Sequence, residues 1–206
     1  MQELLIVAGA HLLAVSSPGP DFALVLKNSL SNGRSVGIYT AFGIALGILV
    51  HVFYSIVGLA VVISQSIVLF NAIKLVGAAY LIWIGIKSLR SKKQTDEEAI
   101  QNKPTETMTN SAAVRQGFLT NVLNPKVTLF FLSLFTQVIS TETGVGLKAI
   151  YGLEMTVATF VWFTLIAVFM TQKPIRKVYA SIRHYIDRLF GVALIALGLR
   201  VSLSSR

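Results

Sequence analysis

The sequence predicts an all-α membrane protein with six transmembrane helices, arranged as two inverted three-helix repeats in which the first helix of each repeat is broken at proline. Three observations predict this class. Hydrophobic residues make up 54% of the 206 residues and charged residues only 13%, and the mean hydropathy of +0.70 is far above that of a soluble domain. Apolar runs of about 20 residues, the length that crosses a bilayer, recur along the chain. Similar sequence patterns also occur in its two halves.

Six apolar runs are candidates for membrane-spanning helices. They cover residues 2–30, 35–63, 67–89, 112–139, 147–170 and 187–203. Polar connections follow the first, third and fifth runs, and the other connections are short and nearly uncharged. The first run contains Glu3, and no lysine or arginine precedes Ser16, whereas a signal peptide begins with positive charge. We therefore expect this run to belong to the mature chain.

Lysine and arginine are concentrated in the three polar connections. Most of the 18 lysine and arginine residues lie there, and the cytoplasmic loops of membrane proteins carry such an excess. We therefore expect these connections on the cytoplasmic side and both termini outside the cytoplasm. The net charge of +9 then reflects membrane orientation, and no nucleic-acid partner is expected, because no nucleic-acid-binding motif accompanies the charge.

The third connection divides the chain into two halves. Residues 91–111 are polar and almost free of apolar side chains, so we expect a flexible cytoplasmic linker between a first repeat (1–90) and a second repeat (112–206). The motif KLVGAAYLIWIGIK in the third run is similar to RLFGVALIALGLR in the sixth, and SSPGPDFAL in the first corresponds to VLNPKVTLFF in the fourth. With three spans in each repeat, the second copy enters the membrane from the opposite side, so the pair is inverted.

Prolines interrupt the first and fourth runs. A proline inside a helix removes a backbone donor and clashes with the preceding turn, at a cost of about 3 kcal/mol, and lipid offers no water to the freed carbonyls. We therefore expect Pro18, Pro20 and Pro125 beside protein or a water-filled cavity. Breaks at matched depth in two inverted halves bring two half-helix N-termini together. Their free N–H groups and partial positive charge predict an anion site.

A charged residue follows each break. Asp21 and Lys126 have two interpretations. In the first they form a structural or gating link, in which they pair with each other or with backbone groups, or Lys126 snorkels to the cytoplasmic side. In the second, Asp21 holds a substrate ammonium while Lys126 and the helix ends hold a carboxylate. Asn121 and Asn124 flank the second break, where they either cap freed backbone groups or contact the solute.

Three residues are candidates for carrying a coupling proton, namely Asp21, Glu154 and His51. Glu154 lies within the fifth run, and its alternative position is the outer membrane interface. His51 lies in the second run, where a lone histidine near a tyrosine is more often a hydrogen-bonded residue of a helix bundle.

The residue inventory argues against other classes of function. The chain has no cysteine, which excludes disulfides and thiolate chemistry, and its three histidines are scattered. No nucleophile and base, metal-ligand cluster or phosphate-binding loop occurs at a recognisable spacing, so we expect no enzyme, no metal site and no cofactor. A scaffold subunit would have unbroken, uncharged spans. A transporter driven by an ion gradient fits best, and the alternative to an organic solute is a metal or other inorganic ion.

Four stretches of the chain resemble the LysE/RhtB family of amino-acid exporters: PGPDF, GIYTAFGIALGILVH, KLVGAAYLIWIGIKSL and QGFLTNVLNPKVTLFF. The resemblance implies a six-span protein of the bacterial inner membrane that exports a small amino acid or close derivative by antiport with protons. PGPDF favours the threonine and homoserine branch. The implied partners are the amino acid, protons and the lipid bilayer, and a homo-oligomer is left open. The residues that match the family motifs are Pro18, Gly19, Pro20, Asn124, Pro125 and Lys126.

Overall fold

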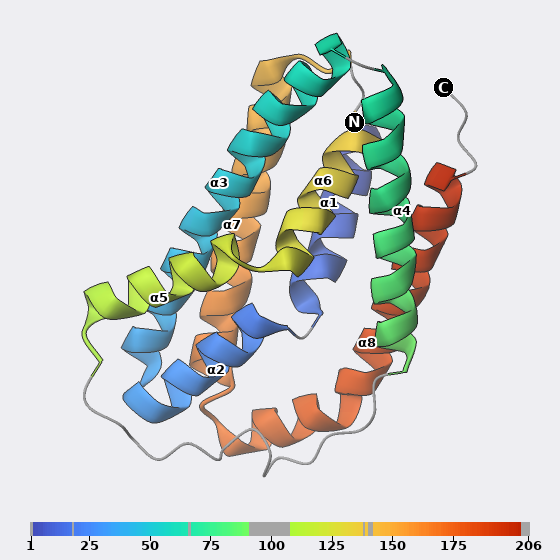
Figure 1. The fold of residues 1–206 in the computed structure, drawn as a ribbon. Coiled ribbons are helices and arrows are strands. Elements are labelled where there is room, and N and C mark those ends of the chain that lie inside the picture. The colour runs from blue at the N-terminus through green and yellow to red at the C-terminus, as the bar shows by residue number, and fades with distance from the viewer. Residues whose placement is uncertain are drawn as a thin grey trace.

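The computed structural model describes residues 2–17, 19–65, 67–90, 108–137, 139 and 142–202. These residues form eight α-helices and no β-strand, which confirms the all-α class (Figure 1). Pro18 and most of the expected linker lie outside the described residues. The helices are α1 (Gln2–Ser16), α2 (Pro20–Asn32), α3 (Arg34–Gln65), α4 (Ile67–Leu89), α5 (Asn110–Val122), α6 (Pro125–Gln137), α7 (Val145–Phe169) and α8 (Lys173–Ser202).

Two of the six apolar runs are each built from two helices. The first run is divided into α1 and α2, and the fourth into α5 and α6, which meet at a bend of 56°. α2 and α6 each begin at a proline, Pro20 and Pro125. Proline is tolerated there because the first N–H groups of a helix have no partner within the helix. The predicted breaks are therefore present at both places.

The helices form an elongated bundle in which the two breaks lie in the middle (Figure 1). Figure 1 shows that α1 begins and α8 ends at the same end of this bundle. α3 packs along α7 and α4 packs along α8, while α1 and α6 lie between these two pairs (Figure 1). α2 and α5 contact each other and run across the bundle rather than along it (Figure 1). Both breaks therefore point their ends toward the centre of the molecule.

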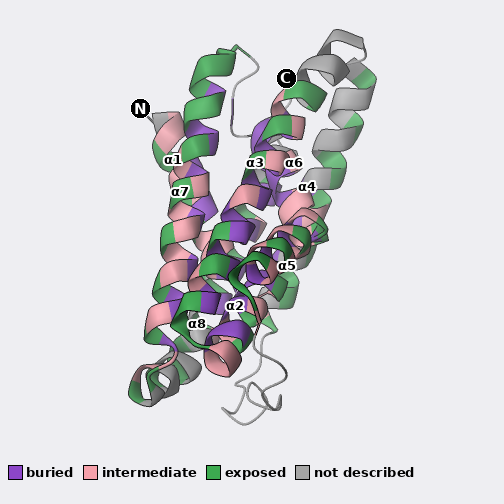
Figure 2. Cartoon of the chain, turned by 90° about the vertical axis from the view of Figure 1, so that its left-hand side faces the viewer, coloured by how far each residue is buried: buried purple, intermediate pink, exposed green. Residues whose placement is uncertain are grey.

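The outer surface of the bundle is apolar. Exposed positions follow the outward faces of the helices, and buried positions face the interior (Figure 2). Large side chains on these outward faces include Phe53, Leu153 and Leu165, which are 69%, 60% and 43% exposed. In water such a surface would promote association, whereas lipid tails solvate it. The surface is that of a membrane protein.

Two helices of the described residues are long and apolar enough to cross a bilayer by themselves. These are Arg34–Gly58 within α3, and α7; the bent pair of α5 and α6 makes a third if it counts as one span. α1 has 15 residues, which is short of the roughly 20 that a bilayer needs. Membrane-spanning helices are thus present, and the number of six stays a prediction.

The polar connection expected after the fifth run is helical instead. α8 begins at Lys173 and continues without interruption into the sixth run, which was expected to begin at residue 187. Figure 1 shows its first part lying across the end of the bundle before the helix turns along α4. Apolar residues recur in this segment at Ile175, Val178 and Ile182, a spacing typical of an amphipathic helix. The many charged residues of this segment suggested a loop, whereas the spacing of its apolar residues indicates the helix that is present.

Glycines allow two pairs of helices to approach closely. In α3 and α5, a Cβ added to Gly43 would collide with the carbonyl oxygen of Val114, and one added to Gly47 would lie 2.5 Å from Oδ1 of Asn121. In α4 and α8, a Cβ on Gly191 would lie 2.6 Å from the carbonyl oxygen of Gly85. Small residues let membrane helices pack backbone to backbone. The α3–α5 contact holds the second break in place, because Asn121 belongs to it.

Two polar clusters connect the first half of the chain to the second. Nδ2 of Asn28 in α2 donates hydrogen bonds to Oγ1 of Thr40 in α3 (2.9 Å) and to Oε1 of Gln116 in α5 (3.0 Å). The Asn28 side chain is 1% exposed, so this cluster is an interior one. At the end of the bundle where α1 begins, the Glu3 carboxylate accepts hydrogen bonds from the hydroxyls of Thr143 (3.2 Å) and Tyr151 (3.3 Å).

Candidate functional site

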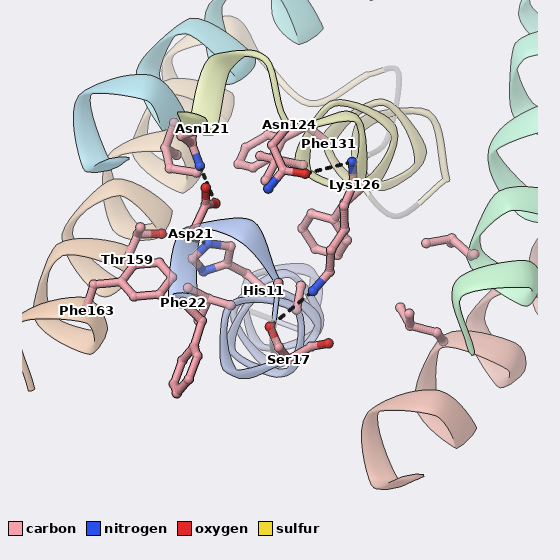
Figure 3. Close-up of a pocket in the computed structure, with 18 residues that line it drawn as sticks. His11, Ser17, Asp21, Phe22, Asn121, Asn124, Lys126, Phe131, Thr159 and Phe163 are labelled. Carbon is pink, nitrogen blue, oxygen red and sulfur yellow. Dashed lines mark hydrogen bonds between the residues drawn. The ribbon is translucent and has the colours of Figure 1, made fainter. Parts of the chain in front are cut away.

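The two helix breaks meet in the interior, where Asp21 contacts the end of α5. Nδ2 of Asn121 donates a hydrogen bond of 2.9 Å to Oδ2 of Asp21, and the side-chain amide of Asn124 also interacts with this carboxylate (Figure 3). Asp21, Asn121 and Asn124 are 7%, 1% and 4% exposed. Asp21 lies in the first turn of α2, where the helix dipole favours a negative charge. The carboxylate is therefore held by its own helix and by two amides of the other half.

Lys126 reaches in the opposite direction, from the second break to the first. Its Nζ donates a hydrogen bond of 3.1 Å to the carbonyl oxygen of Ser17, at the end of α1 (Figure 3). In an uninterrupted helix that carbonyl would accept the N–H of residue 21, so the break has freed it. The ammonium also lies against Gly19, because a Cβ there would be 3.6 Å from Nζ.

The position of Lys126 resolves an electrostatic conflict in the sequence. A cation in the first turn of α6 opposes the dipole of that helix, whereas the C-terminal end of α1 attracts a cation. The Lys126 side chain extends away from the start of α6, and its ammonium contacts the C-terminal end of α1. It also interacts electrostatically with Asp21 and with Asp187 of α8, which is 2% exposed. The backbone contact of the first interpretation is thus present, and the binding of a substrate carboxylate stays a prediction.

Asn124 caps α6. Its Oδ1 accepts a hydrogen bond of 3.1 Å from the backbone N–H of Lys126, and its carbonyl accepts from the N–H groups of Val127 and Thr128. This is the usual way in which an asparagine satisfies the free N–H groups of a helix start. The capping interpretation of Asn124 is confirmed. Its amide group remains on the cavity side, where it meets Asp21.

His51 contacts the backbone of the second break and lies outside the cavity lining. It is 0% exposed, and its Nε2 lies 3.1 Å from the carbonyl oxygen of Asn121 while its Nδ1 lies 2.6 Å from the hydroxyl of Tyr54. A carbonyl only accepts, so Nε2 carries the proton in the neutral ring and Nδ1 accepts from the tyrosine. The ring also stacks on Phe131 at a centroid distance of 5.6 Å. His51 is the hydrogen-bonded bundle residue of the second interpretation, and it does not line the cavity.

A cavity of about 590 Å³, including its open side, lies between the breaks. One wall is polar and holds Asp21, Asn121, Asn124 and Lys126, and the remainder is mostly aliphatic and aromatic (Figure 3). Sites for small organic molecules have this mixture of a few polar groups with apolar walls. The lining residues are His11, Ala14, Val15, Ser17, Gly19, Asp21, Phe22, Ile48, Leu81, Asn121, Asn124, Lys126, Val127, Phe130, Phe131, Thr159, Phe163 and Leu194.

The structure thus brings together five of the predicted site residues and separates others from them. Gly19, Asp21, Asn121, Asn124 and Lys126 line the cavity. The remaining predicted residues that the structure describes do not line it: Pro20 and Pro125 start their helices, His51 lies behind the break, and Glu154 is half-buried elsewhere on α7.

Among the cavity residues that were not predicted are two polar side chains, His11 and Thr159, and a signal in the sequence was available for one of them. His11 precedes the first break by two helical turns, and the spacing of His11, Ala14 and Val15 puts them on one face of α1. All three line the cavity. Thr159 of α7 carried no such signal, because threonines are common inside apolar helices.

The fold and the cavity define an all-helical membrane protein with a partly polar interior cavity. Residues 12–205 match the family described as LysE type translocator, and the chain belongs to this family. A translocator family is not an enzyme class. No solved structure matches the chain.

Named relatives of the chain are efflux proteins. The threonine efflux protein of Salmonella typhi is 29% identical over 199 residues, which cover 96% of both chains. The threonine efflux protein of Escherichia coli (strain K12) is 28% identical over 201 residues, covering 97% of both chains. The leucine efflux protein of Enterobacter sp. (strain 638) is 34% identical over 143 residues, which cover 67% of this chain and 65% of the relative.

Proposed function

We propose that this protein is a secondary active exporter of a small amino acid or close derivative across the bacterial inner membrane, coupled to proton entry by antiport and working by alternating access. The observation that carries the proposal is the meeting of the two breaks around one cavity. A carboxylate, two amides, an ammonium and a freed carbonyl lie there within an apolar interior. Buried polar groups of both signs at the depth of broken helices are typical of a site for a zwitterion.

The polar wall fits the two charged groups that all α-amino acids share. Asp21 offers a carboxylate to a substrate ammonium. Lys126 and the amide of Asn124 offer donors to a substrate carboxylate, and the dipole of α6 favours a negative charge at this end of the helix. The apolar remainder of the cavity then accommodates the side chain. The threonine and leucine efflux relatives support an amino acid of modest size.

Six spans in two inverted repeats are part of the same proposal. When KLVGAAYLIWIGIK is aligned with RLFGVALIALGLR, Gly85 corresponds to Gly198. Gly191 corresponds to the residue before Ala78. In a two-fold arrangement, a contact of Gly85 with Gly191 implies the matching contact of Gly198 near Ala78. A Cβ on Gly198 would lie 2.9 Å from the carbonyl oxygen of Ala78, so the α4–α8 contact is nearly reciprocal. Antiparallel packing alone produces such a contact, so the inverted repeat rests on the paired motifs and on the two proline breaks.

Of the three candidates for the coupling proton, Asp21 is the one we favour. It lies in the cavity itself, so protonation and substrate binding compete for the same carboxylate. This competition couples the flux of protons to the flux of the amino acid, and the coupling needs no other residue. Glu154 and His51 lie outside the cavity lining, and a proton function for either requires a connection to the site.

The alternative of a metal or inorganic ion carrier is less well supported. In the described part of the chain, no three histidine, aspartate or glutamate side chains form a group that would hold a metal ion. A lysine beside the carboxylate would also repel a cation.

Reconstituted transport tests the proposal. Proteoliposomes containing the purified protein are loaded with a panel of labelled amino acids, and an inward proton gradient is imposed. We expect one or a few small amino acids to leave faster with the gradient than without it, and protein-free liposomes to retain them. Movement of metal ions only, or of no amino acid in the panel, would overturn the proposal.

A further inference from the structure

A second polar position in the cavity is formed by α1 and α7 and is independent of the two breaks. Nε2 of His11 lies 3.1 Å from Oγ1 of Thr159, and both residues line the cavity. They are 3% and 0% exposed, so the contact lies within the protein interior. Figure 3 shows the His11 ring projecting among the labelled cavity residues, next to Thr159.

The surroundings of His11 are otherwise apolar. The rings of Phe130 and Phe131 lie beside it, one tilted and one edge-on, each at a centroid distance of 6.4 Å. The other ring nitrogen, Nδ1, is shielded from solvent and has no hydrogen-bond partner within the described residues. Buried polar atoms are nearly always paired in folded proteins. Because the His11 ring lines the cavity, a ligand bound there is a candidate for the missing polar partner of Nδ1.

The chemistry of that partner follows from the Thr159 contact. If the threonine hydroxyl donates to Nε2, then Nδ1 carries the proton and is a donor; if Nε2 donates to the hydroxyl, then Nδ1 is an acceptor. A hydroxyl or a carboxamide contains both a donor and an acceptor, so either group satisfies Nδ1 in both cases. An aliphatic side chain of the same size satisfies neither.

We propose that His11 and Thr159 form a subsite that binds the side chain of the substrate and selects a hydroxyl or carboxamide over an aliphatic group of equal size. This subsite deepens the proposed function and rests on it. The amino acid's charged groups occupy the polar wall formed by the breaks, and its side chain extends toward α1 and α7. A site built for a hydrogen bond rejects the analogue that lacks the bond, because its own polar atoms are then left unpaired.

Two isosteric substrate pairs separate the two chemistries. Exchange of labelled substrate is measured in proteoliposomes for threonine against valine, the hydroxyl arm, and for asparagine against leucine, the carboxamide arm. We expect the wild-type protein to prefer the polar member of at least one pair by about tenfold or more, the usual consequence of one unpaired buried group. The arm that shows the preference identifies the group.

Variants assign the preference to the subsite. His11→Phe and Thr159→Val should bring the ratio to about one, through loss of transport of the polar member. Thr156→Val is the matched control, because Thr156 lies on the same helix, donates a hydrogen bond of 2.8 Å to the Gly152 carbonyl and does not line the cavity. It should keep the wild-type ratio. His11→Gln restores a polar group and should recover part of the preference.

The outcomes distinguish the subsite from the function on which it rests. Equal wild-type transport within both pairs overturns the subsite and leaves amino-acid export intact. The subsite alone is also overturned if His11→Phe and Thr159→Val keep the wild-type preference. The same holds if these two variants transport neither member of each pair. Failure of the wild-type protein to move any amino acid overturns the proposed function and the subsite together.

Discussion

Asn121 and Asp21 are 100 positions apart in the chain, and Nδ2 of the first donates a hydrogen bond of 2.9 Å to Oδ2 of the second. Lys126, also in the second half, donates a hydrogen bond from Nζ to the carbonyl oxygen of Ser17 in the first half. Each half of the chain thus satisfies polar groups that the helix break in the other half has exposed. A break in one half alone would leave unpaired groups in an apolar interior, so the two breaks depend on each other.

Replacing Asp21 by asparagine removes the charge and keeps the shape. We expect Asp21→Asn to insert and fold, because an amide oxygen at this position still accepts from Asn121. Transport should fall by roughly tenfold to a hundredfold, since a hydrogen bond to a charged group contributes about 1.5–3 kcal/mol. Initial rates in proteoliposomes measure the effect. A variant that keeps the wild-type rate and its response to the proton gradient would show that the charge of Asp21 is not used.

Removal of Lys126 should be more severe. Lys126→Ala leaves the Ser17 carbonyl without this donor and removes a cation that interacts with the buried carboxylates of Asp21 and Asp187. We expect the variant to insert in the membrane and to lose transport. Lys126→Arg is the matched variant, because it keeps the charge, and it should retain a part of the activity. Efflux and the amount of protein in the membrane are measured together. Wild-type efflux from Lys126→Ala would leave the lysine with a structural function only.

The close contact of α3 with α5 gives a prediction about stability. In Gly47→Ala the new methyl would lie 2.5 Å from Oδ1 and 2.9 Å from Cβ of Asn121, so the end of α5 must move. Overpacking of this kind costs about 1–3 kcal/mol. Gly58→Ala is the control on the same helix, because nothing lies within 4 Å of its added methyl. Thermal unfolding in detergent should show a lower midpoint for Gly47→Ala and an unchanged or slightly higher midpoint for Gly58→Ala. Equal midpoints would contradict the tight contact.

The sequence predicted the features that have a local chemical cause. Prolines within apolar runs identified both breaks to within a few residues, because no other local feature ends a helix so reliably inside lipid. The charged residues after the breaks were also recognisable, since ionisable groups are rare in such runs. The limits of α4 coincide with those of the third apolar run, 67–89.

Features that depend on distant partners were not predictable. Nothing near Asp21 in the sequence indicates that Asn121 donates to it, and nothing near His51 indicates the carbonyl that it holds. His11 looked like one histidine among apolar residues, and only the helix packing places it in the cavity. The start of α8 was missed for a different reason, because its basic residues obscured an apolar periodicity.

Cysteine labelling tests the predicted orientation. The natural chain has no cysteine, so a single introduced thiol has no background. Ser111 in the first turn of α5 and Gly144 at the start of α7 are both exposed. An impermeant maleimide added to intact cells should label Gly144→Cys at once, and Ser111→Cys only after the membrane is opened, because the basic connections face the cytoplasm. The reverse pattern would invert the orientation.

Crosslinking tests whether the two halves move relative to each other. Asn28 of α2 and Gln116 of α5 are joined side chain to side chain at 3.0 Å and belong to different halves. In alternating access this contact must open during each cycle, so a short bifunctional thiol reagent that joins Asn28→Cys to Gln116→Cys should stop transport. Reduction of the crosslink should restore transport.

The control for this experiment lies within one half. Asn28 and Thr40 are 2.9 Å apart and both belong to the first half. If each half moves as a body, a link between Asn28→Cys and Thr40→Cys leaves the relative motion free, and transport should continue at the rate of the uncrosslinked double variant. Inhibition by both links to the same degree would mean that α2 moves against α3 as well, and that the halves are not the moving units. Continued transport with the Asn28–Gln116 link in place would mean that this contact never opens, because the covalent bond excludes the separation that alternating access requires.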